Sequence, residues 1–109
     1  DLALYVDGFL AYEQGKQDEA LDRFTRILRE FPQSRFVPDA HMAKAESLFN
    51  AKYDYAGALV EYEEVLKFKS SELYGLALFK SAWCLWRLNR TDEAARRFVS
   101  VFEVTDAQE

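Results

Sequence analysis

Apolar residues recur every three or four positions along most of the chain, which is the spacing of one face of an α-helix. One such series consists of Leu21, Phe24, Ile27, Leu28 and Phe31. Short polar segments separate six stretches of this kind. The pattern predicts helices at about residues 2–14, 17–30, 38–51, 55–68, 71–88 and 91–104. Since the chain has only 4 Gly and 2 Pro, it has little turn chemistry for a many-stranded β fold, and we expect an all-α protein.

A short motif returns three times along the chain. In each copy a polar turn is followed by an alanine and, four residues later, by an aromatic residue. The three copies end in Ala20–Phe24, Ala58–Tyr62 and Ala94–Phe98, at spacings of 38 and 36 residues. A helical bundle without repeats does not account for this recurrence. The spacing therefore predicts a stack of helix-turn-helix repeats.

The first copy resembles the tetratricopeptide repeat, whose signature is a small residue, an alanine, an aromatic residue and a closing proline. Gly8, Ala20, Phe24 and Pro32 stand at these positions. The third copy has Ala82 at the small position and lacks the proline. The second copy departs further, because a small residue, a turn glycine and a proline are usual where this chain has Glu46, Tyr53 and Ser70.

The resemblance implies an all-α, right-handed superhelical stack of three antiparallel helix pairs, which is an α–α solenoid. The repeats are expected at about residues 2–34, 38–70 and 72–106 of a single domain that covers 1–109. The last helix is apolar over much of its surface, and no polar capping helix follows it. We therefore expect a fragment of a longer protein, or an end covered by another molecule such as a second copy. The expected assembly face consists of Phe98, Val99 and Phe102.

The segment between the first two repeats is more particular. Residues 31–40 combine Pro32, Ser34, Phe36 and Pro38 in a join similar to that of tetratricopeptide proteins of the bacterial cell envelope. These include periplasmic partners of the Tol-Pal system and the lipoprotein of the outer-membrane assembly machine. The likeness implies a periplasmic or outer-membrane-associated protein.

In a tetratricopeptide stack the first helix of each pair lines a concave groove. Matching to the family pattern places aromatic residues at both ends of this groove and small residues between them, which leaves room for an extended or helical peptide. Trp and Tyr often carry binding energy at such surfaces. The alternative is that these aromatic residues belong to the core, as a stripe at helical spacing often does. The expected groove residues are Tyr5, Phe9, Tyr12, Ser47, Asn50, Phe79, Trp83, Trp86 and Arg87.

Charge and reactive side chains exclude several other functions. A net charge of -5 argues against binding to nucleic acid or to anionic lipid. No stretch is apolar for long enough to insert into a membrane. A single cysteine, Cys84, is expected to be a buried, inert thiol, and a single histidine, His41, is expected to be solvated or to cap a helix. The acidic run of Glu61, Glu63 and Glu64 indicates a solvated outer face.

These observations favour an interaction scaffold over an enzyme. We expect no catalytic residues, cofactor or metal, and we expect a protein or peptide partner that binds in the groove or at the terminal helix. A homo-oligomer formed through the terminal helix is a further expectation. The alternative is a structural spacer, or a self-assembling segment of a longer solenoid.

Overall fold

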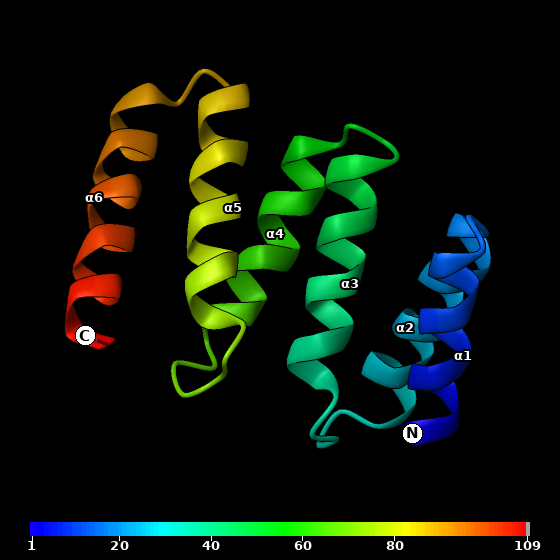
Figure 1. Ribbon diagram of the computed structural model, residues 1–109. Helices are drawn as coiled ribbons and strands as arrows, with labels where there is room; N and C mark the ends of the chain where they lie inside the picture. Colours follow the sequence, from blue (N-terminus) through cyan, green and yellow to red (C-terminus); the bar gives the residue numbers. More distant parts are fainter. Residues whose placement is uncertain (109) are drawn as a thin grey trace.

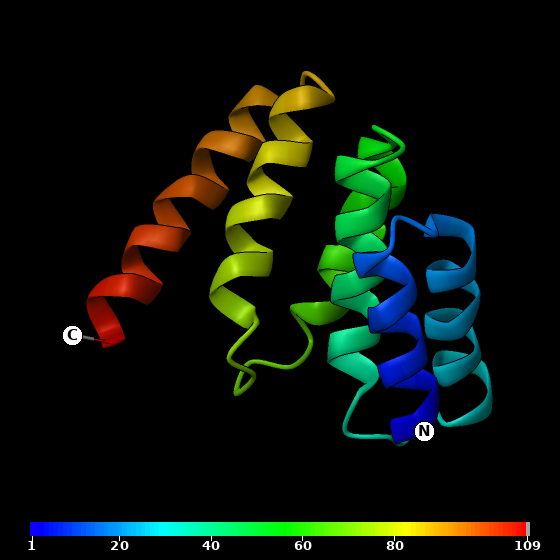
Figure 2. The ribbon, with the colours of Figure 1, turned by 45° about the vertical axis from the view of Figure 1, so that its right-hand side comes forward.

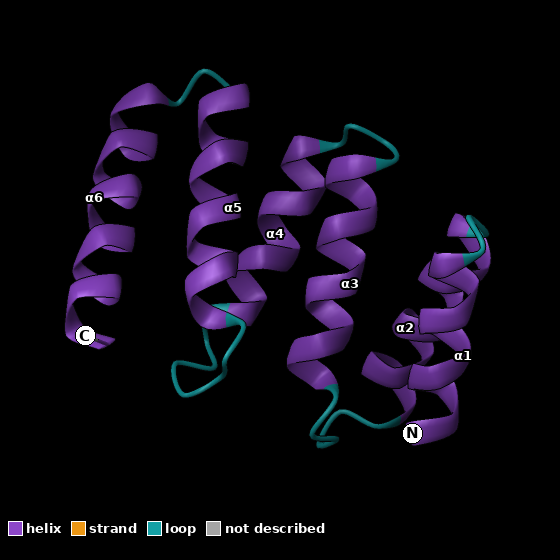
Figure 3. Ribbon diagram, in the orientation of Figure 1, coloured by secondary structure: helices purple, strands orange, loops and turns teal. Residues whose placement is uncertain are grey.

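The computed structural model describes the backbone of residues 1–108 and the side chains of residues 1–104. Within this part of the chain there are six α-helices and no strand (Figures 1 and 3). The helix that ends the chain continues beyond its predicted end at residue 104. The helices are α1 (Leu2–Glu13), α2 (Gln17–Glu30), α3 (Val37–Asn50), α4 (Tyr55–Val65), α5 (Tyr74–Arg87) and α6 (Thr91–Gln108).

The helices stack in the order of the sequence. Each packs mainly on the helices next to it along the chain, α1 on α2, α2 on α3 and so on to α6. Figures 1 and 2 both place the α1–α2 pair and the α5–α6 pair at opposite ends of the molecule, with α3–α4 between them. The two helices of each pair run antiparallel. The expected all-α solenoid of antiparallel helix pairs is therefore confirmed.

The connection between α4 and α5 is longer than the sequence predicts. Helix α4 ends at Val65 because the amide of Phe68 donates to the carbonyl of Val65, three residues back, at 3.0 Å. The hydroxyl of Ser71 then accepts the amide of Leu73 at 3.1 Å, which holds another turn. As a result α5 begins at Tyr74 instead of residue 71.

Each helix pair turns through one residue in the left-handed region of backbone space. These residues are Gly15 (φ 77°), Tyr53 (φ 55°) and Asn89 (φ 63°). No other described residue has a positive φ. Glycine adopts this conformation without strain and asparagine tolerates it, whereas other residues are destabilised there by roughly 1–2 kcal/mol. The stack therefore imposes the same turn on three different side chains.

Small residues set the distance between the helices of the first pair. A Cβ atom on Gly8 would lie 2.9 Å from Cε1 of Phe24, so the Phe24 ring packs directly on the backbone of α1. In the second pair Glu46 stands at the position of Gly8. The buried phenol of Tyr62 donates a hydrogen bond of 2.6 Å to Oε1 of Glu46. A polar contact thus replaces the ring-on-backbone contact and accommodates the larger side chain.

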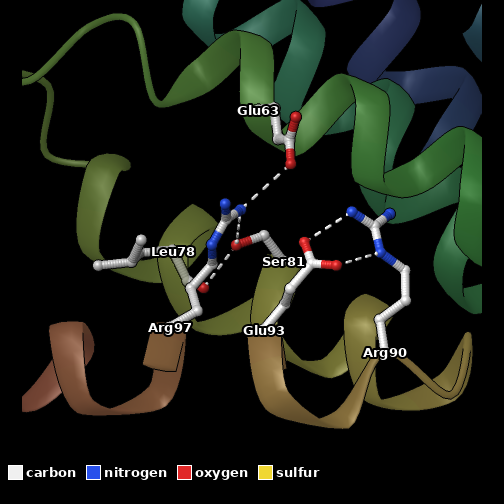
Figure 4. Close-up of polar contacts among 6 residues, drawn as sticks. All are labelled: Glu63, Leu78, Ser81, Arg90, Glu93 and Arg97. Atoms are coloured by element: carbon white, nitrogen blue, oxygen red, sulfur yellow. Dashed lines mark hydrogen bonds and ion pairs between the residues drawn. The ribbon is translucent and has the colours of Figure 1, made fainter. Parts of the chain in front are cut away.

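An arginine ties the last pair to the one before it (Figure 4). Nη1 of Arg97 on α6 donates to Oγ of Ser81 on α5 at 3.2 Å and pairs with Oε1 of Glu63 on α4 at 3.3 Å. The Ser81 hydroxyl is buried and donates to the carbonyl of Leu78 at 2.7 Å. Glu63 is exposed, as expected, and Arg97 links it to Ser81 of the last pair.

Candidate functional site

A cleft lies between α1 and α3, with a volume of about 270 Å³. We call it the α1–α3 cleft. Three of the predicted groove residues from α1 meet there with side chains of α2 and α3 and with the residue before α5. Its lining consists of Tyr5, Phe9, Tyr12, Phe24, Asp39, Met42, Ala43, Glu46 and Leu73.

The aromatic residues of the cleft belong partly to the core. The Tyr5 ring stacks on Phe36 at a centroid distance of 4.8 Å and meets the edge of Phe24 at 6.3 Å. Tyr12 also packs against the buried residues of this end of the molecule. Phe9 is different, because 49% of its surface is exposed. Core packing therefore fixes most of the cleft wall, while about half of the Phe9 surface stays exposed.

Two carboxylates line the cleft, and they differ in their hydrogen bonds and ion pairs. Glu46 already has partners, since it accepts hydrogen bonds from Tyr62 and, at 3.2 Å, from Asn50, and it lies 3.9 Å from Nζ of Lys80. Asp39 lies in the first turn of α3 and is half-buried, and it makes no hydrogen bond or ion pair with the residues whose side chains are described. Burial raises the pKa of Asp39 above its ordinary value. Burial, and then the Asp39 charge, raise the pKa of the Tyr5 phenol.

A second hollow, of about 390 Å³, lies between α5 and α6. We call it the α5–α6 hollow. Trp83 and Trp86 line it and remain 39% and 52% exposed. Phe79, Trp83 and Phe98 form a cluster of three rings, with centroid distances from 5.4 to 6.2 Å. The rest of the lining consists of Thr91, Ala94 and Ala95.

The middle of the predicted groove differs from the expectation. Ser47 is only 1% exposed, and its hydroxyl donates to Oε1 of Gln17 on α2 at 2.7 Å. Ser47 is therefore not accessible to a partner, contrary to the expectation, because α3 turns this position toward α2. Asn50 is exposed. Arg87 is also exposed, and its guanidinium carbon lies 5.6 Å from the ring centre of Tyr55.

The residues expected to form an assembly face are divided between two environments. Val99 and Phe102 are exposed on α6, and Phe102 is the most exposed large apolar residue of the described part. Phe98 is partly buried in the ring cluster with Phe79 and Trp83. Val99 and Phe102 are therefore the exposed members of the expected assembly face, and Phe98 belongs to the ring cluster.

A family model of the tetratricopeptide repeat matches residues 3–34 and 76–102, which together make up more than half of the chain. The chain belongs to the tetratricopeptide repeat family. Repeats of this family are non-catalytic scaffolds that mediate protein–protein interactions. A search of curated proteins finds no match to the chain.

The two matched segments of this tetratricopeptide protein contain most of α1–α2 and of α5–α6, and the middle pair lies outside them. Glu46, Tyr53 and Ser70, which depart from the repeat signature, all lie in that unmatched part. The middle pair keeps the packing of the repeat with different side chains. The Tyr62–Glu46 hydrogen bond is one of the contacts between its two helices.

The histidine of this tetratricopeptide protein neither is solvated nor caps a helix, contrary to the expectation. Nδ1 of His41 lies 2.6 Å from Oε2 of Glu61, whose other oxygen lies 3.2 Å from Nζ of Lys44. Burial raises the pKa of Glu61, but the contacts with His41 and Lys44 outweigh burial and leave the pKa below its ordinary value. The expectation of a solvated outer face is therefore wrong for Glu61, because it packs between α3 and α4.

No other reactive constellation emerges in the described residues of this tetratricopeptide protein. Burial and the Glu46 charge raise the pKa of the Cys84 thiol to about 12, so that it stays protonated at neutral pH. No group of three or more His, Cys, Asp or Glu side chains there is arranged to hold a metal ion. Nor do residues 1–108 contain a helix with the length and apolar character needed to cross a membrane.

Sequence reasoning missed part of the α1–α3 cleft. Asp39 and Glu46 are seven residues apart, so helical spacing alone places them on one face of α3. That signal was available in the sequence. Leu73 carries no such signal, because it comes from the connection before α5 and reaches the cleft only through the stacking of the pairs.

Proposed function

We propose that this protein binds a segment of a partner protein along the first helices of its repeats, from the α1–α3 cleft toward the exposed tryptophans of α5. The observation that carries the proposal is a shared register. Phe9 and Tyr12 precede Ala20 by eleven and eight residues, and Trp83 and Trp86 precede Ala94 by the same intervals. Each pair of aromatic residues lines a cavity at its own repeat.

The exposed rings provide enough apolar area for useful affinity. Fully burying an aromatic side chain removes about 150–250 Å² from water, so covering the open half of one ring removes on the order of 100 Å². At about 25 cal/mol per Å², each covered ring contributes on the order of 2 kcal/mol before the costs of association. Since Phe9, Trp83 and Trp86 are held on rigid helices, the ordering cost falls mainly on the partner.

A second candidate rests on a different surface. Val99 and Phe102 expose apolar side chains on α6, which favours assembly through this helix, either with a second copy or within a longer solenoid for which the repeats act as a spacer. For localisation, the join at residues 31–40 supports the bacterial cell envelope, by its likeness to envelope tetratricopeptide proteins.

Peptide selection on the purified chain tests the scaffold function. Random twelve-residue peptides displayed on phage are selected on the chain, and the affinity of the selected peptides is then measured by fluorescence anisotropy. We expect Phe9→Ala, or Trp83→Ala with Trp86→Ala, to weaken binding by about tenfold or more, as truncation of a central aromatic anchor does.

Phe31→Ala is the matched control, because Phe31 is 41% exposed, close to the 49% of Phe9, and does not line the cleft. It should leave the affinity unchanged. If no peptide is selected, or if the selected peptides bind all the variants equally well, the groove does not bind a partner. Sedimentation of the Phe102→Ala variant across a range of concentrations separately tests assembly through α6.

A further inference from the structure

We propose that the α1–α3 cleft receives a basic side chain of the partner segment, an arginine, between its aromatic wall and the carboxylate of Asp39. This inference deepens the proposed function and rests on it. The occupant is chosen by the size of the cleft, the chemistry of its walls and the charge that faces it.

The size of the cleft suits a side chain. Its volume of about 270 Å³ lies below the range of about 300–1,000 Å³ that is usual for sites that enclose a whole small molecule. A single long side chain can enter such a space while the rest of a polypeptide stays outside it. The cleft is therefore a subsite for one position of a bound segment.

The walls of the cleft attract a cation. Tyr5, Phe9, Tyr12 and Phe24 line it with aromatic rings, of which Phe9 is 49% exposed and Phe24 only 2%. The face of an accessible ring attracts a positive charge within about 6 Å. The Asp39 carboxylate adds a full negative charge to the same wall. No cation of the chain among the described residues pairs with Asp39, so this charge is available to a partner.

The state of Asp39 distinguishes a cation from other occupants. The raised pKa of Asp39 reflects a carboxylate that burial has partly stripped of water. An acidic side chain would meet direct repulsion from it. An apolar side chain would strip away more water without offering a hydrogen bond, which is unfavourable for a charged group. A basic side chain replaces the lost hydration with a charge-assisted hydrogen bond.

The molecule already contains this mode of recognition. Lys80 of α5 places its Nζ 5.0 Å from the ring centre of Phe49 and 3.9 Å from Oε2 of Glu46, so that a cation lies between a ring and a carboxylate of α3. Arg35 likewise places its guanidinium carbon 4.9 Å from the centre of the Phe36 ring. Arginine is favoured over lysine in the cleft because its planar, weakly hydrated guanidinium stacks on rings and binds a carboxylate through two N–H groups.

Three blocked tripeptides test this inference at pH 7. They carry arginine, its uncharged isostere citrulline, or glutamate between two leucines, and their binding is followed by the amide chemical shifts of ¹⁵N-labelled protein. We expect the arginine peptide to bind about fivefold or more tightly than the citrulline peptide, and the glutamate peptide to bind most weakly. The shifts should be centred on α1 and α3.

Variants assign the preference to the cleft. Asp39→Asn should reduce the ratio of arginine to citrulline affinity to about twofold or less, whereas Asp18→Asn, at an exposed carboxylate on α2, should leave it unchanged. Phe9→Leu keeps an apolar side chain and removes the ring, so it should also lower the ratio of arginine to citrulline affinity. It tests the inference even if Asp39→Asn fails to fold.

Two results would overturn the inference. One is equal binding of the arginine and citrulline peptides to the unmodified protein, or no shift of the cleft amides up to about 10 mM of either peptide. The other is an arginine preference that survives both Asp39→Asn and Phe9→Leu. Either result leaves the scaffold function standing, because the phage selection tests that function with peptides of any composition.

Discussion

The shared left-handed turn predicts that two opposite substitutions will change stability in opposite directions. At φ 77°, Gly15 has no atom within 4 Å of the position that a Cβ would occupy, so Gly15→Ala introduces backbone strain and no clash. That strain amounts to roughly 1–2 kcal/mol. Alanine loses less entropy than glycine on folding, which offsets part of this strain. We therefore expect Gly15→Ala to lower the free energy of unfolding by about 1 kcal/mol.

Tyr53→Gly should act in the other direction. Tyr53 has φ 55° and is 70% exposed, so its side chain contributes little packing and its backbone is strained. Removing roughly 1–2 kcal/mol of strain, against about 0.5–1 kcal/mol for the extra freedom of glycine in the unfolded chain, leaves a gain of about 0.5–1 kcal/mol.

Urea unfolding followed by circular dichroism measures both changes as shifts of the midpoint at constant slope. Tyr53→Ala is the control, because it removes the side chain and keeps the strained backbone. It should therefore be clearly less stable than Tyr53→Gly. If Tyr53→Gly proves no more stable than Tyr53→Ala, the left-handed conformation is not a source of strain at this turn and the reasoning is wrong.

Two further predictions concern titratable groups. Because the contacts with His41 and Lys44 hold the pKa of Glu61 below its ordinary value of 4.5, Glu61 stabilises the fold above about pH 4.5, and this contribution is lost as the pH falls through the folded-state pKa. Glu61→Gln should lower the free energy of unfolding at pH 7 by about 1–2 kcal/mol and should make that free energy decline less steeply in acid. Urea unfolding at several pH values measures both effects. An unchanged dependence on pH in acid would contradict the role given to Glu61. Burial raises the pKa of Cys84 to about 12, so iodoacetamide should modify it very slowly at pH 8 in the folded protein and rapidly in urea, as followed by mass spectrometry. Equal rates in the two states would show that the thiol is accessible.

The helical repeat could be predicted from sequence because its signals are local. Apolar spacing identifies one face of each helix, and the Ala20–Phe24 motif and its two later copies mark where the second helix of each pair packs on the first. These features depend on neighbours within one or two turns of helix. The predicted limits of the α4–α5 connection were wrong, because they depend on turns within the connection, such as the one in which the Leu73 amide donates to the Ser71 hydroxyl.

The candidate site was predictable only in part. Phe9, Trp83 and Trp86 are exposed on first helices, where the resemblance to the repeat placed them, although their binding role remains a proposal. Tyr5 shows why the rest was harder to assign, since it both stacks on Phe36 in the core and lines the cleft. A helical stripe in a sequence does not tell which part of a ring a neighbouring element will cover.

By itself, the sequence determined six helices, because each depends on the apolar periodicity of a single segment. It also determined their pairing into repeats, because the alanine–aromatic motif returns at nearly equal spacing. Only the tertiary structure decided that Ser47 is buried against Gln17 and that His41 pairs with Glu61. It also decided that Asp39 lines an aromatic cleft in which no side chain of residues 1–104 forms an ion pair with it. The physical reason is that these contacts join side chains of different helices. The rotation of each helix against its neighbour sets those contacts, and the spacing of residues along one helix does not encode it.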